Sequence, residues 1–357
     1  MKKEEKKYYI LGLESSCDES AAAIIEFDRK ANFKVLSSVV FSQVDMHQQY
    51  GGVVPELAAR EHVAMILPVL DQALQKAKIE LRQLSAIAVT SGPGLITSLI
   101  SASETAKALS FVYNIPLIAS NHIEGHIYSA FLENKEKINF PALVLTVSGG
   151  HNILALMTNH LKYKVIGQTL DDAAGEAFDK AAKMMGLGYP GGPIIEKLAQ
   201  KYQEENKNNL EEIKLPRPML NLNNFDFSFS GLKTALLYQL RKDKNWKKKI
   251  PQYCYSFQKA TIDVLLGKTL KAVKKYRPQS IILVGGVSAN STLKKAFINE
   301  IKNNPDLKNI KFIAPAQKYS GDNATMIALN GIFHFLKNKK NLKNYRNLKI
   351  NSHLDLA

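Results

Sequence analysis

The sequence feature that most constrains the fold is a strand–turn–strand pattern that occurs twice. Largely apolar residues fill 8–16 and 20–27 with a polar turn between them, and the same order returns at 141–148 and 151–157. Each pair is followed by segments that alternate between strand and helix patterns, which predicts sheets that are mostly parallel beyond the opening hairpins. The sequence therefore predicts a duplicated, two-lobed α/β architecture, and a cleft between such lobes is a usual ligand site.

A long helix is predicted at 55–77, because Pro55 is a favoured helix start and apolar residues follow it at helical spacing. The expected buried stripe consists of Leu57, Val63, Ile66, Leu70 and Leu74. Pro68 lies inside this segment and is expected to kink the helix or to split it in two. Residues 251–277 are expected to form one long helix or two, and 206–229 to be irregular.

A chain of 357 residues is long enough for two domains, each with its own core. We expect residues 1–135 to form an N-terminal lobe, joined by a C-terminal helix at about 322–337, and residues 136–321 to form a C-terminal lobe. Residues 338–357 are rich in Lys and Asn and are expected to form a peripheral tail.

The net charge of +16 is unusual for a protein of otherwise ordinary composition. Such a charge favours a polyanionic partner such as nucleic acid, through attraction to phosphates. The alternative is that basic clusters, such as those at 247–249 and 337–340, are solvated faces of a Lys-rich chain.

The two cysteines, Cys17 and Cys254, are too few and too far apart for a disulfide framework or a paired-cysteine zinc pattern. The N-terminal segment carries Glu4 and Glu5 and too short an apolar run for a signal peptide, and no apolar stretch approaches the ~20 residues of a membrane helix. We therefore expect a cytoplasmic protein with no membrane association.

Two histidines, His122 and His126, lie four residues apart where a predicted strand leads into a short helix. This spacing puts both imidazoles on one helix face, where they form either half of a metal site or an ordinary polar face. The metalloprotease signature requires Glu directly after the first histidine. Here Ile123 occupies that position and Glu124 comes one residue later, which argues against proteolysis.

Asp322 lies far along the chain at another strand-to-helix junction. It is either the N-cap of the following helix or the third member of a two-histidine, one-carboxylate set with His122 and His126. Such a set leaves positions open for a substrate and suits Fe(II) or Zn(II).

Two glycine turns are candidates for contact with a nucleotide. The turn at 147–151 has paired glycines that let phosphate approach the backbone, and a buried strand runs directly into Gly285 and Gly286 before a helix. Neither turn matches GxGxxG, so a dinucleotide fold is disfavoured. Asn290 either contacts a ribose or phosphate or caps the helix.

The first turn, which contains Asp18 and Glu19, is either a polar hairpin turn or a set of carboxylates for metal binding or proton transfer. Cys17 is next to them, but no cationic neighbour in the sequence would make it a thiolate, so we expect an inert thiol.

Taken together, the motifs resemble those of one family, the bacterial tRNA adenosine threonylcarbamoyltransferases (TsaD) of the actin, sugar-kinase and Hsp70 superfamily. The matching pieces are GLESSCDES (12–20), QYGGVVPELAAREHV (49–63), SGPGL (91–95), NHIEGH (121–126), VSGGH (147–151), DDAAGEAFDKAAKMMGLGYPGGP (171–193), FSFSGLKTA (227–235), GGVSAN (285–290) and SGDNATMIA (320–328). Each piece is modest alone, but their order and spacing are specific. Ser15 and Asn152 are small departures from the pattern, and the Lys/Asn-rich tail matches no motif.

The resemblance implies an actin/Hsp70/sugar-kinase-like (ribonuclease H-like) fold with a central nucleotide cleft. It implies transfer of the threonylcarbamoyl group from threonylcarbamoyl-AMP to the N(6) amine of the adenosine 3′ of the anticodon, in tRNAs that read codons starting with A, with release of AMP. It also implies two helper proteins, a TsaB-like paralogue and a TsaE-like ATPase.

Site residues follow from the same resemblance. The implied metal ligands are His122, His126 and Asp322, and the implied cofactor is one divalent metal ion, Fe²⁺ or alternatively Zn²⁺. The residues assigned to the adenylate are Thr146, Val147, Ser148, Gly149, Gly150, Asp179, Gly192 and Asn290. Asp18 and Glu19 lie where the family has functionally important acids, and Asp18 is the better candidate for accepting the proton of the amine.

Three other kinds of function remain as alternatives: a metalloprotease, a small-molecule kinase or carbamoyltransferase of the same superfamily, and a non-catalytic subunit. A metalloprotease would use the histidine pair but lacks its base position. A kinase of the superfamily needs no histidine pair, and a small-molecule carbamoyltransferase usually carries an added domain for which this chain has no room. A non-catalytic tRNA-binding or regulatory subunit would not need His122, His126 and Asp322.

Overall fold

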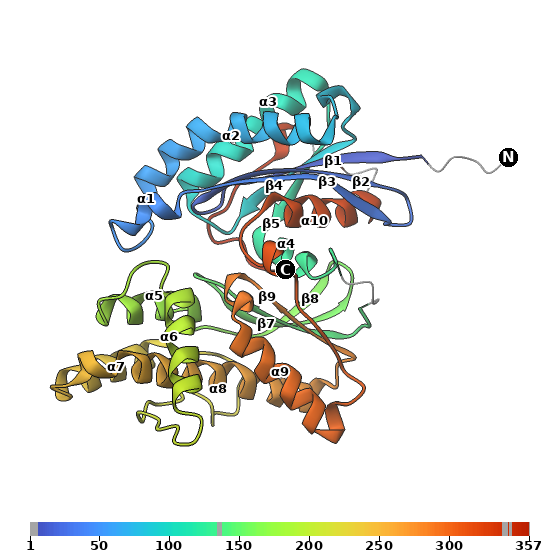
Figure 1. Cartoon of the computed structure of the whole chain (residues 1–357). Helices are drawn as coiled ribbons and strands as arrows, with labels where there is room; N and C mark the ends of the chain where they lie inside the picture. Colours follow the sequence, from blue (N-terminus) through green and yellow to red (C-terminus); the bar gives the residue numbers. More distant parts are fainter. Residues whose placement is uncertain (1–5, 134–137, 338–341, 343–344, 357) are drawn as a thin grey trace. The chain divides into compact units, whose positions relative to one another are not determined.

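Two mixed five-stranded sheets form the framework of the protein (Figure 1). The computed structural model describes the whole chain except residues 1–5, 134–137, 338–341, 343–344 and 357. Its chain divides into two compact units: unit 1 comprises Met1–Glu133 and Ala316–Ala357, and unit 2 comprises Asn134–Pro315.

Unit 1 contains the first sheet and the helices that pack on it. Its strands are β1 (Tyr8–Glu14), β2 (Glu19–Phe27), β3 (Phe33–Ser42), β4 (Ala86–Gly92) and β5 (Leu117–Asn121), in the order β3-β2-β1-β4-β5. Its helices are α1 (Val44–Gln48), α2 (Pro55–Ala77), α3 (Ile96–Tyr113), α4 (His122–Ser129) and α10 (Ala324–Lys337). Helices α2 and α3 cover one face of this sheet, and α10 lies against the other (Figure 1).

Unit 2 repeats this plan with the second sheet. Its strands are β6 (Ala142–Val147), β7 (Asn152–Asn159), β8 (Lys162–Gln168), β9 (Ser280–Val284) and β10 (Lys311–Ile313), in the order β10-β9-β6-β7-β8. Its helices are α5 (Ala174–Met184), α6 (Gly191–Glu205), α7 (Ser230–Lys242), α8 (Ile250–Tyr276) and α9 (Ser291–Asn303). Two short 3₁₀ turns matter below, η2 (Trp246–Lys249) and η3 (Gly286–Ala289).

The two sheets have the same topology. In unit 1, β1 pairs antiparallel with β2 and parallel with β4, and β2 pairs antiparallel with β3. In unit 2, β6 pairs antiparallel with β7 and parallel with β9, and β7 pairs antiparallel with β8. The predicted duplicated α/β architecture is therefore confirmed.

Close packing of α10 on β1 fixes where the loop before α10 lies. A methyl group on Gly12 would collide with the carbonyl oxygen of Ala324, and one on Gly331 would lie 2.5 Å from the Cβ of Ala88. The helix backbone can approach the sheet this closely only because these positions lack side chains. This contact sets the position of Asp322, two residues before α10 begins.

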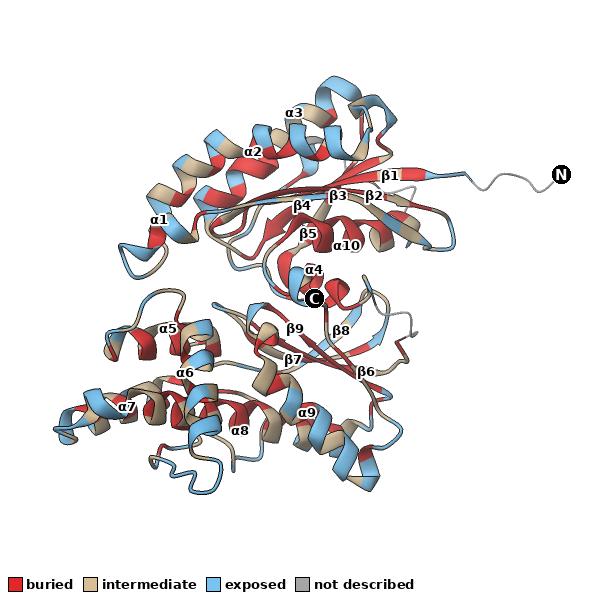
Figure 2. Ribbon diagram, viewed as in Figure 1, coloured by how far each residue is buried: buried red, intermediate tan, exposed pale blue. Residues whose placement is uncertain are grey.

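Helix α2 differs from its prediction in two ways. It is one continuous helix in spite of Pro68, so of the two outcomes expected at this proline, a kink or a split, the split is wrong. Val63 is 69% exposed, whereas Ile66 and Leu70 are buried as expected. The buried stripe instead consists of Ala58, His62, Ile66, Val69, Leu70 and Ala73, and Val63 and Leu67 lie on the exposed side of the helix. Figure 2 shows both buried and exposed residues along α2.

The C-terminal segment is not the peripheral tail that the sequence suggested, at least in the part that the structure describes. Leu348 is buried among the core residues of unit 1. The amide of Asn351 donates to the carbonyl of Ser91 at 2.8 Å, and Asn121 Nδ2 donates to the carbonyl of Asp355 at 2.9 Å. Backbone hydrogen bonds and a buried leucine, which composition does not reveal, hold this segment to the unit.

None of the described helices is both long enough and apolar enough to span a lipid bilayer.

Candidate active site

The histidine-bearing segment forms the short helix α4 at the end of strand β5. Asn121 caps this helix, since its Oδ1 accepts hydrogen bonds from the amides of Ile123 and Glu124 at 2.8 and 3.2 Å. The cap fixes the helix start at His122, and the spacing of four residues then places His126 on the same face. Every residue of α4 is buried.

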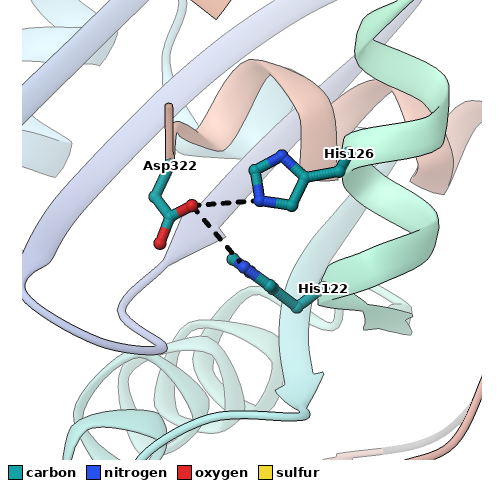
Figure 3. A group of neighbouring side chains, drawn as sticks. All are labelled: His122, His126 and Asp322. Atoms are coloured by element: carbon teal, nitrogen blue, oxygen red, sulfur yellow. Dashed lines mark ion pairs between the residues drawn. The ribbon is translucent and has the colours of Figure 1, made fainter. Parts of the chain in front are cut away.

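Asp322 meets both histidines (Figure 3). Its Oδ1 lies 3.5 Å from His122 Nε2 and 3.1 Å from His126 Nε2. One potential ligand atom from each of the three side chains lies within 4.8 Å of the others. Three residues separated by up to 200 positions in sequence thus form a two-histidine, one-carboxylate group.

Asp322 is not the N-cap of α10. The capping hydrogen bond comes from the next residue, because Asn323 Oδ1 accepts from the amide of Met326 at 3.1 Å. The alternative that Asp322 serves only as a cap is therefore wrong, and its carboxylate faces the histidines instead.

The surroundings of His126 fit a bound metal ion. This side chain is fully buried, and its Nε2 lies 3.1 Å from Asp322 Oδ1 without a hydrogen bond of normal geometry between them. A cation bound between these two atoms would satisfy both the imidazole nitrogen and the carboxylate. The group of one carboxylate and two imidazoles is a candidate metal-binding site of the open type that suits divalent first-row metals.

His122 carries a strongly shifted pKa. Burial alone would lower it, but the carboxylates of Asp322 and Glu14 outweigh burial and raise the pKa of His122 to about 9. Conversely, burial tends to raise the pKa of Glu14, and the interactions with His122 dominate and lower it. Without a metal ion the site therefore favours a charged imidazolium between two carboxylates.

The first turn brings Asp18 and Glu19 into the electrostatic environment of Asp322. Burial, followed by the charges of Asp322 and Asp18, raises the pKa of Glu19 well above its usual value. The same causes, burial first and then Asp18 and Asp322, raise the pKa of the Cys17 thiol. A raised thiol pKa agrees with the inert thiol expected at Cys17.

Unit 2 contains a cavity of about 250 Å³. Four of the residues assigned to the adenylate line it, namely Gly149, Asp179, Gly192 and Asn290. A methyl group built on Gly149, Gly192 or Gly286 would meet nothing within 4 Å, so these glycines leave space rather than pack. The cavity is thus bordered by backbone that a planar ligand could approach closely.

The other four predicted contacts have different surroundings. Thr146 and Val147 are buried in β6. Ser148 closes the β6–β7 turn, donating its amide to the carbonyl of His151 at 2.8 Å. Neither these three nor Gly150 is among the residues that line the cavity. Their contact with a ligand stays a prediction.

Asn290 and Asp179 also have structural roles. Asn290 caps α9, because its Oδ1 accepts from the amide of Leu293, and its Nδ2 donates to Gln258. Asp179 Oδ1 accepts from the amide of Gly191 at 2.7 Å. Helix capping and lining of the cavity are therefore not alternatives at Asn290: the side chain does both.

Sequence reasoning did not single out several residues of these sites, among them Phe178, Glu196 and Glu14. Phe178 and Glu196 line the cavity of unit 2, and Glu14 lies behind His122. Phe178 belongs to the matched motif at 171–193 and Glu14 to the motif at 12–20, so both were available as signals. Glu196 follows the Gly-Gly-Pro turn by three residues and has no distinguishing pattern of its own.

The fold and its two sites define a class of protein: duplicated α/β units, one with a candidate metal group and the other with a glycine-bordered cavity. A family model described as TsaD, tRNA N6-adenosine threonylcarbamoyltransferase, matches residues 34–329. The chain belongs to this family of tRNA-modifying transferases.

Curated relatives agree over almost the whole chain. The tRNA N6-adenosine threonylcarbamoyltransferase of Persephonella marina is 45% identical over 329 residues, which cover 91% of this chain and 90% of the relative. The protein of the same name from Bacillus subtilis is 46% identical over 336 residues, covering 94% and 92% of the two chains.

Among solved structures, HypF of T. kodakarensis matches with a TM-score of 0.60 at 11% identity, covering 97% of this chain and 49% of that one. At this identity the match shows the fold alone, and this chain corresponds to about half of the length of HypF.

Proposed function

We propose that this transferase takes the threonylcarbamoyl group from threonylcarbamoyl-AMP. The acceptor would be the N(6) amine of the adenosine 3′ of the anticodon, in tRNAs that read codons starting with A, and AMP would be released. One observation carries the proposal. The chain is a member of this family, and Gly149, Asp179, Gly192 and Asn290, the residues expected to contact the adenylate, line one cavity in unit 2.

The residues of unit 2 would bind and orient the adenylate. Glycines at the cavity border admit the flat adenine ring, and the carboxylate of Glu196 and the amide of Asn290 supply polar groups for ribose or base. The donor is a mixed anhydride and already activated, so no protein nucleophile is required. Positioning of the amine against the carbonyl carbon would supply much of the rate.

His122, His126 and Asp322 would hold the metal ion. When bound, the metal supplies a Lewis acid that draws charge from phosphate or carbamoyl oxygens. We propose Fe²⁺ as the ion, with Zn²⁺ as the alternative, because imidazole and carboxylate ligands suit both. Elemental analysis of protein purified without oxygen separates the two metals.

We propose that Asp18 accepts the proton that the amine loses. Glu19 is less suited, because its raised pKa favours the protonated form, which cannot accept a proton. Glu19→Gln mimics the protonated carboxyl and is therefore a matched control. Asp18→Asn should lower transfer from preformed adenylate by about 100-fold or more, and Glu19→Gln by much less. Full activity of Asp18→Asn would exclude the assigned role.

We propose that tRNA binds largely through phosphate contacts, as the net charge of +16 favours. The turn η2 and the end of α7 carry a dense basic run, which consists of Arg241, Lys242, Lys244, Lys247, Lys248 and Lys249. Asp243 is the one acidic residue within this run, and it pairs with Lys249 at 2.8 Å.

Helper proteins resembling TsaB and TsaE are part of the proposal. Helices α2 and α3 expose large apolar side chains, which support a protein partner on the outer side of unit 1: Val63, Leu67, Ile96, Ile100, Phe111 and Val112. A cytoplasmic location also belongs here, since tRNA is the acceptor and both cysteines are free.

The decisive experiment is mass analysis of tRNA nucleosides after incubation of the protein with tRNA and threonylcarbamoyl-AMP, with and without the helpers. Formation of threonylcarbamoyladenosine at the position 3′ of the anticodon is the expected result. Unmodified tRNA in every arm, with intact adenylate remaining, would contradict the proposal. Membership of the TsaD family disfavours the metalloprotease, small-molecule and non-catalytic alternatives.

A further inference from the structure

The two histidines of the candidate metal group differ in what lies behind them. His122 Nδ1 is 3.1 Å from Glu14 Oε2 and 3.1 Å from Ser16 Oγ. For His126, Nδ1 is buried and has no hydrogen-bond partner within the described part of the chain. Both rings direct Nε2 toward Asp322, so only His122 is held from both sides.

Glu14 is itself fixed in place. It is fully buried at the end of β1, where the amide of Ser16 donates to Oε1 at 2.6 Å and Thr90 Oγ1 donates to Oε2 at 2.7 Å. These two donors come from the following turn and from the neighbouring parallel strand β4. The carboxylate therefore cannot rotate away from His122 without breaking at least one buried hydrogen bond.

An ionised carboxylate can only accept hydrogen bonds. A neutral His122 that bonds to Glu14 must therefore carry its hydrogen on Nδ1, which leaves the lone pair of Nε2 directed at the ligand group. Carboxylates that orient a metal-binding histidine in this way fix its tautomer and ring orientation and raise its basicity.

We propose that Glu14 is a positioning residue that sets the tautomer and ring orientation of His122 for metal binding through Nε2. The inference rests on the proposed metal site and adds to it a residue that does not itself touch the ion. A glutamine at this position would break the arrangement. Its single carbonyl oxygen cannot accept from all three donors, and its amide group would offer His122 a proton and favour the opposite tautomer.

The first test compares Glu14→Gln with Glu124→Gln in the full-length, metal-free protein, with Co²⁺ alone as the probe. Glu124 is the matched control, because it is a buried carboxylate on α4 that pairs with His334 at 2.7 Å. Glu14→Gln should weaken Co²⁺ binding by about 10- to 100-fold and change the visible absorption of bound Co²⁺. Glu124→Gln should change neither.

The outcomes separate this inference from the function on which it rests. If wild-type protein binds no Co²⁺, the metal site is wrong and the inference falls with it. If wild type and Glu14→Gln bind Co²⁺ equally, with the same spectrum, only the inference is overturned. An equal loss in Glu124→Gln would also overturn it, since the effect would then be general to buried carboxylates on or near α4.

A second measurement does not depend on a folded variant. Nitrogen-15 NMR of histidine-labelled wild-type protein loaded with Zn²⁺ should show His122 protonated at Nδ1 and metal-bound at Nε2. Binding through Nδ1 would overturn the proposal. Ser16→Ala removes the other nearby oxygen and should leave Co²⁺ affinity within about two-fold, because the carboxylate remains; a loss as large as that of Glu14→Gln would assign the role to Ser16 instead.

Discussion

Two turns occupy the same place in sheets of the same topology, namely the β1–β2 turn of unit 1 and the β6–β7 turn of unit 2. They differ in the groups that they present: carboxylates in the first and glycine backbone in the second. The first turn holds Asp18 and Glu19 next to a buried carboxylate at the end of β1. The second holds Gly149 and Gly150, which offer backbone and space. The sheet fixes where a turn lies, and the side chains at the strand ends decide whether the turn presents carboxylates or open backbone.

The largest expected effect tests whether metal binding belongs to unit 1 alone. His126→Ala removes one of the three side chains of the candidate metal group, so metal content should fall below detection and transfer should fall by about 100-fold or more. Adenosine binding should be unchanged. Elemental analysis, transfer assays and calorimetry with adenosine measure the three quantities, and exposed His353→Ala is the control. An equally large loss of adenosine affinity would show that metal binding and adenosine binding are not independent.

The pH dependence of stability should also distinguish the units. The pKa of His122 is about 9 in the folded, metal-free protein and about 6.5 when unfolded, so its stabilising effect is complete below pH 6.5 and is lost as the pH rises to 9. The free energy of unfolding of unit 1 should fall by up to about 3 kcal/mol across that range.

Hydrogen exchange of the strands, corrected for intrinsic rates, measures this fall in unit 1 and should show little change in unit 2. Asp322→Asn removes the charge that most strongly raises the pKa of His122, and it should flatten the dependence. An equally steep fall in Asp322→Asn would mean that another group titrates.

A smaller effect is expected in the cavity of unit 2. Gly192→Val places a branched side chain in empty space at the cavity border and should weaken adenosine binding by about ten-fold, with metal content unchanged. Gly231→Val is the control, because that glycine also has room for a Cβ but does not line the cavity. If Gly192→Val and wild type bind adenosine with equal affinity, the cavity is not part of the adenylate site.

The smallest effect concerns tRNA. Replacing Lys247 and Lys248 by Ala should lower the slope of log affinity against log salt concentration by about 2, if both lysines contact phosphates. The control replaces Lys76 and Lys78, two exposed lysines of unit 1. Filter binding at several salt concentrations gives the slopes. An equal change in both variants would show that the net charge acts as a whole and that neither unit dominates.

Much of the fold could be predicted from the sequence, because local patterns determine it. The alternation of apolar runs and helical spacing gave the strands of both sheets and the helices α2 and α8, and the repeated hairpins gave the duplication. The pairing of His122 and His126 followed from helix geometry alone. Their combination with Asp322 came from the motif set, since nothing local connects residues 200 positions apart.

Other features depended on tertiary packing. The exposure of Val63 depends on which side of α2 meets the sheet, and helical spacing does not specify how wide that side is. The described C-terminal residues are held by backbone hydrogen bonds to Ser91 and Gly94, which any residue type could make.

By itself, the sequence determined the family, the duplicated fold and the identity of the candidate ligands, because these depend on residue types in a fixed order. Only the tertiary structure decided that Asn323, not Asp322, caps α10, and that Glu14 lies behind His122. The physical reason is that β1, β4 and β5 are neighbours in one parallel arrangement, so sheet register brings Glu14, Thr90 and His122 together from distant parts of the chain.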